Sequence, residues 1–432
     1  MTNGTNLDPW YYNYAQRTGG LAASEVRALF AVASRPEVVS LAGGMPYVSA
    51  LPEDLVVGAM SRVMREQGPV ALQYGSGQGV PLLREQILDV MALEGISGSA
   101  DDVVVTTGSQ HALELMAKIF LDPGDVVIAE GPSYVTALVI FKSYQAEVDQ
   151  VPMDEHGLIP GALREHISRL RSAGRTIKLL YTVPTFHNPA GVTLSWERRL
   201  EVLEICRENG ILVLEDNPYG LLYFGERPPV AMRSIETEGV VYLGTFSKTL
   251  APGFRLGWAL APHAIREKLI LANEAAVLSP SSFTQLVVSQ YLSDADWKSQ
   301  IGTFRGVYRE RKEAMLSALQ ENLPSLSWTN PNGGFYVWLT LPDRLDSKAM
   351  LPRAVKELVA YTPGTAFYAD GNGANNIRLS FCYPTPEQIR IGIKRLATVV
   401  NGELDLLDTF EGTGSLTPVH QEQSILPPTD MR

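Results

Sequence analysis

The chain has 432 residues, of which 45% are hydrophobic and 19% charged, and its formal net charge at pH 7 is −11. This length exceeds what one compact core usually takes and predicts two domains of unequal size. The negative charge, without any Lys/Arg-rich run, argues against nucleic acid as a partner, and no apolar run approaches the roughly 18 residues of a membrane helix.

Residues 1–20 mix aromatic and turn-forming residues without periodicity, so we expect an arm that orders only against another surface. This segment has neither the basic opening nor the apolar stretch of a secretory signal, and the expected location is therefore cytoplasmic. Ser24 caps a predicted helix that contains Arg27. A short strand follows and runs into Gly43-Gly44, a pair of glycines that permits close backbone approach to a ligand, although a plain turn also accounts for the pair.

The segment Tyr74–Gly79 contains three glycines and at first sight resembles a dinucleotide-binding loop. Its spacing is G-x-G-x-G, whereas the dinucleotide fingerprint is G-x-G-x-x-G directly after a strand. The residues in front of it, Glu66–Pro69, do not have the pattern of a strand. We therefore expect no nicotinamide cofactor.

Two strands are predicted at 102–107 and 126–130. The first leads through Gly108, Ser109 and Gln110 directly into a helix. Free N–H groups at such a helix start attract phosphate. The second strand is followed by Tyr134, a candidate stacking partner for a flat ring, although ordinary packing also accounts for a tyrosine there.

From about residue 179 to residue 260, strands alternate with helices, which is typical of a parallel sheet covered on both faces. Asn188, Asp216 and Lys248 each follow one of these strands. Because the carboxyl ends of parallel strands meet at one edge of the sheet, we expect these three side chains to share a cleft.

Lys248 is the candidate nucleophile, because a deprotonated lysine amine condenses with an aldehyde. Desolvation and like-charge repulsion from Arg255, in the loop that follows, would both lower the pKa of Lys248. The alternative is a solvated loop lysine, and Lys248 by itself does not distinguish the two.

The pattern changes near residue 294. A long helix at 297–322, a segment at 328–341 and a strand at 375–382 that holds Arg378 predict a second, antiparallel domain. The residues beyond 403 are expected to form a loose tail. The six histidines lack metal-type spacing and the two cysteines are far apart in apolar contexts, so we expect buried thiols and neither a metal site nor a disulfide.

Four short motifs occur along the chain: Asn-Pro-x-Gly at 188–191, Asp-x-x-Tyr at 216–219, Ser-Lys-x-x-x-Pro-Gly-x-Arg at 247–255 and Asn-Ile-Arg-Leu-Ser-Phe at 376–381. Together they resemble the fold-type I pyridoxal-phosphate aminotransferases of class I and II. The resemblance is narrowest to the 2-aminoadipate, kynurenine and aromatic amino acid aminotransferases and covers roughly residues 24–400. Thr245, where the family usually has Ser, is a mild departure.

The resemblance implies roles for the matching residues. Lys248 would form a Schiff base with pyridoxal 5'-phosphate and then move the proton between the substrate Cα and the cofactor C4′. Asp216 would pair with the protonated ring nitrogen, so that the ring can accept electrons. Arg378, with backbone at Gly43 and Gly44, would bind the substrate α-carboxylate. Arg27 would meet an acidic substrate side chain or swing aside for an apolar one.

The remaining implied contacts are to the cofactor. They are Tyr219 and Asn188 at the ring oxygen, Tyr134 on the ring face, and Ser109, Gln110, Ser247 and Arg255 at the phosphate, where a guanidinium can form two parallel bonds. Tyr74 would reach the phosphate from the other subunit, which implies a homodimer with shared active sites.

The implied fold is α/β, with a mostly parallel doubly wound sheet in a large domain and a smaller α+β domain. The expected divisions are an arm and mobile helix at 1–47, the cofactor domain at 48–290, the small domain at 291–402 and a disordered tail at 403–432. The implied function is transfer of the α-amino group of an aromatic, aliphatic or 2-aminoadipate-like amino acid to a 2-oxo acid such as 2-oxoglutarate, by a ping-pong mechanism.

Two alternatives stay open at this point. A lyase, decarboxylase or cyclase on the same fold would use the same cofactor. A more remote alternative is a transcriptional regulator, in which this fold follows a basic DNA-binding domain. Because only residues 1–23 precede Ser24, we do not expect the regulator.

Overall fold

The largest sheet has eight strands and is mostly parallel. The computed structural model describes residues 8–20 and 35–410. The strand order in this sheet is β2-β9-β8-β7-β6-β3-β4-β5. The strands are β2 (Val103–Thr106), β3 (Val126–Gly131), β4 (Glu147–Asp154), β5 (Gly157–Leu158), β6 (Ile177–Thr182), β7 (Leu212–Asp216), β8 (Val240–Thr245) and β9 (Gly257–Leu260).

The central strands β4, β3, β6, β7 and β8 pair in parallel, whereas β9 runs antiparallel to β2 and β8, and β5 runs antiparallel to β4. Strands β2, β8 and β9 are buried along their whole length. Continuous burial of this kind means that both faces of the sheet are covered. The predicted doubly wound sheet is therefore confirmed.

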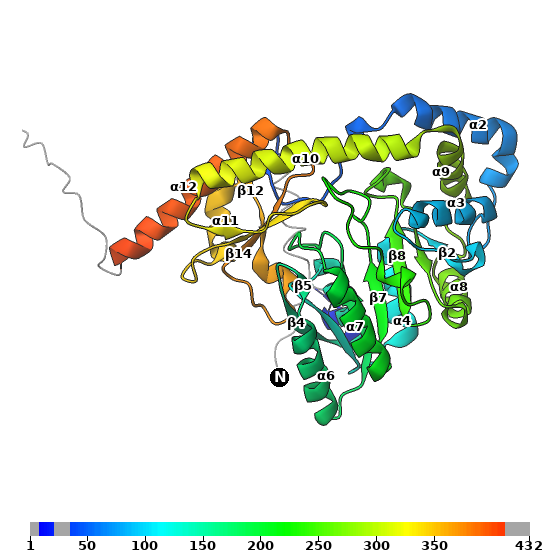
Figure 1. The fold of residues 1–432 in the computed structure, drawn as a ribbon, viewed down its shortest axis with the longest axis horizontal. Helices are drawn as coiled ribbons and strands as arrows, with labels where there is room; N and C mark the ends of the chain where they lie inside the picture. Colours follow the sequence, from blue (N-terminus) through cyan, green and yellow to red (C-terminus); the bar gives the residue numbers. More distant parts are fainter. Residues whose placement is uncertain (1–7, 21–34, 411–432) are drawn as a thin grey trace, which may run out of the picture.

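Helices cover the two faces of the sheet (Figure 1). On one face α4, α5 and α8 share a buried cluster with Val104 and Val127, and on the other α6 and α7 pack with Ile128 and Leu180. The helices of this domain are α2 (Glu53–Ala71), α3 (Pro81–Ala92), α4 (Ser109–Phe120), α5 (Val135–Ser143), α6 (Pro160–Ser172), α7 (Trp196–Asn209), α8 (His263–Val277) and α9 (Ser282–Asp294). Helix α7 is capped by the Ser195 side chain and ends at Gly210, which is left-handed.

A four-stranded antiparallel sheet, ordered β10-β11-β14-β13, forms the core of the second domain. Strand β1, from the N-terminal part of the chain, pairs with β12 beside it. The strands are β1 (Val39–Ser40), β10 (Ser327–Trp328), β11 (Tyr336–Thr340), β12 (Val359–Ala360), β13 (Thr362–Pro363) and β14 (Asn376–Ser380), and the helices are α10 (Trp297–Asn322), α11 (Ser347–Lys356) and α12 (Pro386–Phe410). The predicted antiparallel second domain is confirmed.

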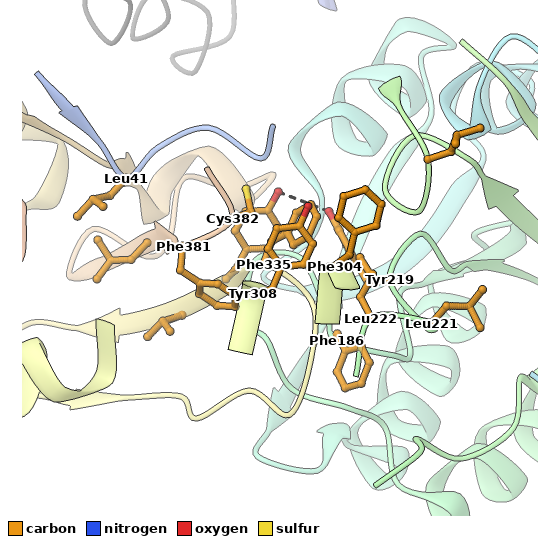
Figure 2. Close-up of a cluster of buried hydrophobic side chains, with 14 of the residues drawn as sticks. Leu41, Phe186, Tyr219, Leu221, Leu222, Phe304, Tyr308, Phe335, Phe381 and Cys382 are labelled. Carbon is orange, nitrogen blue, oxygen red and sulfur yellow. Dashed lines mark hydrogen bonds between the residues drawn. The ribbon is translucent and has the colours of Figure 1, made fainter. Parts of the chain in front are cut away.

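Aromatic side chains fill the junction between the two domains. Figure 2 shows Tyr219, from the loop after β7, beside Phe335, which precedes β11, with Tyr308 of α10 next to them. The ring centroids of Tyr219 and Phe335 are 5.2 Å apart, and those of Tyr308 and Phe335 are 4.8 Å apart. This packing holds a loop of the large sheet against a strand of the small one.

Several predicted limits shift in the structure. The expected domain limit after residue 290 falls inside α9, and the predicted tail begins inside α12, which continues to Phe410. Residues 411–432 and the predicted helix around Arg27 lie outside the described residues.

The short 3₁₀ helices are η1 (Tyr11–Asn13), η2 (Gln16–Gly20), η3 (Val48–Ala50), η4 (Ala100–Asp102), η5 (Met232–Ser234), η6 (Pro252–Phe254) and η7 (Gly364–Phe367).

Two further observations concern the described residues. None of their helices is both long enough and apolar enough to span a membrane, and no group of three or more His, Cys, Asp or Glu side chains among them is placed to hold a metal ion. Cys206 and Cys382 are buried and free, so the prediction of two buried thiols is confirmed.

Candidate active site

A cavity of about 270 Å³ lies at the carboxyl ends of β6, β7 and β8. As predicted, the residues that follow these three strands share one cleft. Eight residues predicted for the site line it: Lys248, Asp216, Asn188, Tyr219, Tyr134, Ser109, Gly44 and Arg378. Six lining residues were not predicted: Met45, Val135, Thr136, Val183, Pro218 and Tyr336.

The amine of Lys248 reaches across the cavity to the small domain. Its Nζ donates to the backbone oxygen of Gly44 at 2.9 Å. Burial is the largest cause that lowers the pKa of Lys248, and the nearby cations Arg378 and Arg255 lower it further, against the raising effects of Cys382 and Asp216. The predicted direction is confirmed, although desolvation outweighs the repulsion from Arg255. The neutral amine, which is the nucleophilic form, is thereby favoured.

Asp216, at the end of β7, has one satisfied and one unsatisfied carboxylate oxygen. The hydroxyl of Tyr181 donates to Oδ2 at 2.9 Å, whereas the buried Oδ1 has no partner. Burial raises the pKa of Asp216 to about 6, although Tyr181 and Lys248 act in the opposite direction. A buried carboxylate oxygen without a donor is costly. Oδ1 therefore suits a cationic N–H, such as the protonated ring nitrogen that the family resemblance implies.

Arg378 lies on β14, where it pairs with Trp338 of β11 and Thr362 of β13. Its guanidinium donates to Asn188 Oδ1 at 2.9 Å and to the backbone oxygen of Ala42 at 2.7 Å. The ring centroid of Tyr336 lies 4.3 Å from the guanidinium carbon. These contacts hold a buried cation in one orientation without neutralising it, which suits a carboxylate ligand.

The start of α4 has the features of an anion site. No side chain caps the helix, and its N-cap Gly108 has φ +92°. A Cβ on Gly108 would lie 2.8 Å from Nη2 of Arg255. Arg255 itself is left-handed, with φ +49°, a conformation that costs free energy for a non-glycine residue. Helix dipole, free N–H groups and guanidinium thus converge where the phosphate is expected.

The other predicted phosphate ligands have different surroundings. Ser247 is buried and forms two hydrogen bonds with the Thr245 hydroxyl. This hydroxyl accepts from the Ser247 N–H at 3.0 Å and donates to the Ser247 Oγ at 2.9 Å. Thr245 therefore supports Ser247, so the departure from the family pattern at 245 leaves a hydroxyl in place. Gln110 lies in the first turn of α4, exposed and outside the cavity lining.

Two further predicted residues need separate comment. The side chain of Tyr74 is 78% exposed, in the loop between α2 and α3, and does not line the cavity. Arg27 lies outside the described residues. Residues 73–79 form a loop between two helices and follow no strand, which agrees with the rejected dinucleotide site.

Two tyrosines stand out among the site residues that sequence reasoning missed: Tyr336, which lines the cavity, and Tyr181, which donates to Asp216. A Cβ on Gly44 would overlap the Tyr336 hydroxyl, so the glycine lets the backbone approach this ring. Tyr219 also donates to the Tyr336 hydroxyl, at 3.4 Å. The available signal was chemical, because each is a tyrosine in a buried strand and a buried phenol needs a hydrogen-bond partner.

Comparisons with known proteins extend this picture. A family model described as "Aminotransferase class I and II" matches residues 38–396. An aromatic-amino-acid aminotransferase of Thermococcus litoralis is 40% identical over 395 residues, covering 90% of this chain and 94% of that protein. A 2-aminoadipate transaminase of Thermus thermophilus is 36% identical over 403 residues, covering 92% and 99%. The crystal structure of a Pyrococcus horikoshii kynurenine aminotransferase in complex with PMP has a TM-score of 0.88 and 40% identity, covering 92% of this chain and 99% of its own.

Proposed function

The chain belongs to the class I and II aminotransferases, and from this membership we propose that it transfers the α-amino group of an amino acid to a 2-oxo acid with pyridoxal phosphate as cofactor. The observation that carries the proposal is the buried, unpaired Asp216 Oδ1 in the same cavity as the amine of Lys248. The cofactor ring accepts electrons well only while its nitrogen is protonated, and a carboxylate beside that nitrogen keeps it protonated. The cofactor aldehyde needs a nearby amine with which to condense.

In the proposed reaction each residue has one task. Pyridoxal phosphate, when bound, supplies a cationic ring that takes up the electron pair left at the substrate α-carbon. Lys248 accepts the α-proton at Nζ, and its lowered pKa favours the neutral amine that this step needs. Asp216 holds the ring nitrogen charged. Arg378 orients the amino acid by its carboxylate.

Asn188 is positioned as a hydrogen-bond donor. Its Oδ1 already accepts from Arg378, so its amide N–H₂ is left for the ring oxygen of the cofactor. Tyr219 would donate to the same oxygen, and Tyr134 would pack on the ring. The proposed phosphate ligands are Ser109, Gln110, Ser247 and Arg255.

We propose neutral aromatic and aliphatic amino acids as donors. The cavity wall includes Met45, Val135, Pro218 and Tyr336, and every charged residue among its described lining has one of the tasks above. An acidic side chain, as in 2-aminoadipate or 2-oxoglutarate, would be met by Arg27. Two half-reactions, with one product released before the second substrate binds, predict ping-pong kinetics.

A panel of amino donors with 2-oxoglutarate as acceptor tests this function. We expect equal amounts of the donor's 2-oxo acid and of glutamate, with parallel double-reciprocal plots. Donors with aromatic, aliphatic and 2-aminoadipate side chains should be compared at equal concentration. Release of ammonia or CO₂ without any glutamate would overturn the proposal in favour of a lyase or decarboxylase on the same fold.

We also propose that the active sites are shared between two subunits of a homodimer. Tyr74 is exposed in the single chain, as are Leu55, Met64, Leu72 and Leu278. Large apolar side chains that are exposed together are typical of an interface with a second copy. In the dimer, Tyr74 would donate to the phosphate in the partner's site. The cytoplasmic location remains a prediction.

Subunit hybrids test the shared site. Tyr74→Ala should weaken cofactor binding by about 10-fold or more, the effect of losing a hydrogen bond to a charged group. Mixing Tyr74→Ala with inactive Lys248→Ala chains should restore activity, because the hybrid dimer has one site with both intact residues. Activity that never exceeds the sum of the separate variants, although mass spectrometry detects hybrids, would contradict sharing.

A further inference from the structure

Glu94 is a titratable residue that lies outside the cavity lining and has no task in the proposed reaction. It follows α3, and its carboxylate is held by two donors. The hydroxyl of Tyr242 donates to Oε2 at 2.5 Å, and the side-chain N–H₂ of Asn217 donates to Oε1 at 2.8 Å. Tyr242 belongs to β8, the strand that leads to Lys248, and Asn217 directly follows Asp216. One side chain therefore links the segments that carry both reactive groups.

The orientation of the Asn217 amide is determined by the turn that it closes. Its Oδ1 accepts from the backbone N–H of Gly220 at 3.0 Å, so its N–H₂ has to face Glu94. Its own backbone N–H donates to Leu243 on β8 at 3.0 Å. The turn 216–220 contains both Asp216 and Tyr219. Glu94 is thus the outer support of the turn that presents these two side chains to the cavity.

The fit around Glu94 is close. A Cβ on Gly220 would overlap its carboxylate, so the absence of a side chain at 220 lets the turn lie directly on Glu94. The titratable groups that act on Glu94 are the carboxyl of Glu215 on β7, the guanidinium of Arg199 on α7 and the phenol of Tyr242, which donates to Glu94. A shift of this carboxylate would therefore move the turn rather than be absorbed by empty space.

We propose that Glu94 is a positioning residue for the cofactor site, which holds the 216–220 turn so that Asp216 and Tyr219 meet the cofactor ring. The inference rests on the proposed function, because it assumes that these two residues contact pyridoxal phosphate. Glu94 acts through hydrogen bonds alone and touches neither cofactor nor substrate.

Glutamine at 94 can keep a hydrogen bond to each partner, with the direction of the one to Tyr242 reversed, whereas alanine can keep neither. In Glu94→Gln the amide oxygen accepts from Asn217 and its N–H₂ donates to the Tyr242 oxygen. In Glu94→Ala two buried donors lose their acceptor. Asp125→Ala is a matched control, because Asp125 is also buried and accepts from the Asp122 N–H at 2.8 Å, but it precedes β3 at the opposite end of the strands.

The affinity for pyridoxal phosphate, measured by titration of the purified apo chain, is the first test. We expect Glu94→Ala to bind about 10-fold or more weakly, the effect of losing a hydrogen bond to a charged group. Glu94→Gln should stay within about twofold of the wild type, because its hydrogen bonds are retained. Asp125→Ala should bind like the wild type whatever its loss of thermal stability. Wild-type affinity in Glu94→Ala, or equal losses in both alanine variants, would overturn the inference.

Asn217→Ala breaks the same bond from the other side and keeps the proposal testable if Glu94→Ala does not fold. Its affinity should fall to a similar extent, and the double variant should lose no more than the larger single loss. Additive losses would overturn the inference. A wild-type chain that binds no pyridoxal phosphate would instead overturn the proposed function itself, so the two failures are distinguishable.

The pH dependence of unfolding gives a readout that needs no cofactor. Burial, with repulsion from Glu215, raises the pKa of Glu94 from 4.5 to about 7. The folded chain therefore binds this proton more tightly than the unfolded chain, and the resulting stabilisation is lost as the pH rises from 4.5 towards 7. We expect the unfolding temperature of the wild type to fall relative to Glu94→Gln across this window. If the difference in unfolding temperature between the two proteins stayed constant across this pH range, the protonation of a buried carboxyl at 94 would not be coupled to folding.

Discussion

Replacing Lys248 with alanine is expected to reduce the transamination rate by roughly 10⁴-fold or more. A general base alone contributes about 10²–10⁴-fold, and Lys248 is proposed to be both the base and the group that holds the cofactor covalently. Its amine donates to the Gly44 oxygen inside the cavity that also holds Asp216. Alanine supplies no amine at that place. Steady-state rates with the best donor of the panel measure the loss.

Covalent attachment provides an independent readout for the same variant. After borohydride reduction, mass spectrometry should find the pyridoxyl group on the wild-type peptide that contains Lys248, and no such adduct on the Lys248→Ala protein. Lys298→Ala is the control, because Lys298 is an exposed lysine of α10 outside the cavity. If Lys248→Ala kept the full rate and the absorption spectrum of the wild type, the proposed role of this lysine would be wrong.

Replacing Asp216 with alanine is expected to reduce the rate by about 10²–10³-fold or more, the usual effect of removing a preorganised charge from a reacting site. The reason is electronic, because a ring nitrogen without a buried anion loses its proton and the ring no longer accepts electrons well. Asp216→Asn keeps the shape and removes the charge, so it should show a similar loss. Rates near that of the wild type in both variants would remove the assigned role.

Tyr181→Phe distinguishes the effect of the Asp216 charge from the effect of the hydrogen bond that Asp216 accepts. It removes the hydroxyl that donates to Asp216 Oδ2 and leaves the negative charge in place, so its loss of rate should be smaller than that of Asp216→Ala. The pH dependence of cofactor affinity is a second readout. Burial raises the pKa of Asp216 from 3.8 to about 6, so the protonated form prevails below that pH and cannot pair with a cationic nitrogen. Affinity should therefore fall as the pH drops through about 6, and this dependence should vanish in Asp216→Asn.

Much of the site was predictable because it depends on local order along the chain. Asp216 ends a parallel strand, Asn188 and Lys248 each follow one, and the carboxyl ends of parallel strands meet at one edge of the sheet. Gly108, at the start of α4, was predictable for a similar reason, since a strand that turns directly into a helix exposes free N–H groups. Family motifs then indicated the chemistry that these positions carry.

Other contacts depend on residues far apart in the sequence. Arg378 meets Asn188 only because β14 pairs with β11 and β13 and the small sheet lies against the ends of the large one. Tyr336 approaches Gly44 across the same junction. The hydrophobic pattern of the sequence does not predict such a pair. It indicates that a side chain is buried, but not which polar group that side chain will contact.

The amino-acid sequence by itself determined the doubly wound sheet and the residues that gather at the carboxyl edge of its parallel strands, because alternating strands and helices allow few arrangements. Only the tertiary structure decided how these residues are supported, with Tyr181 donating to Asp216 and Glu94 accepting from Asn217 in the 216–220 turn, and that Tyr74 is exposed outside the cavity lining of its own chain. The physical reason is that hydrogen-bond partners are selected by distance and direction in space, which the packing of both domains sets together.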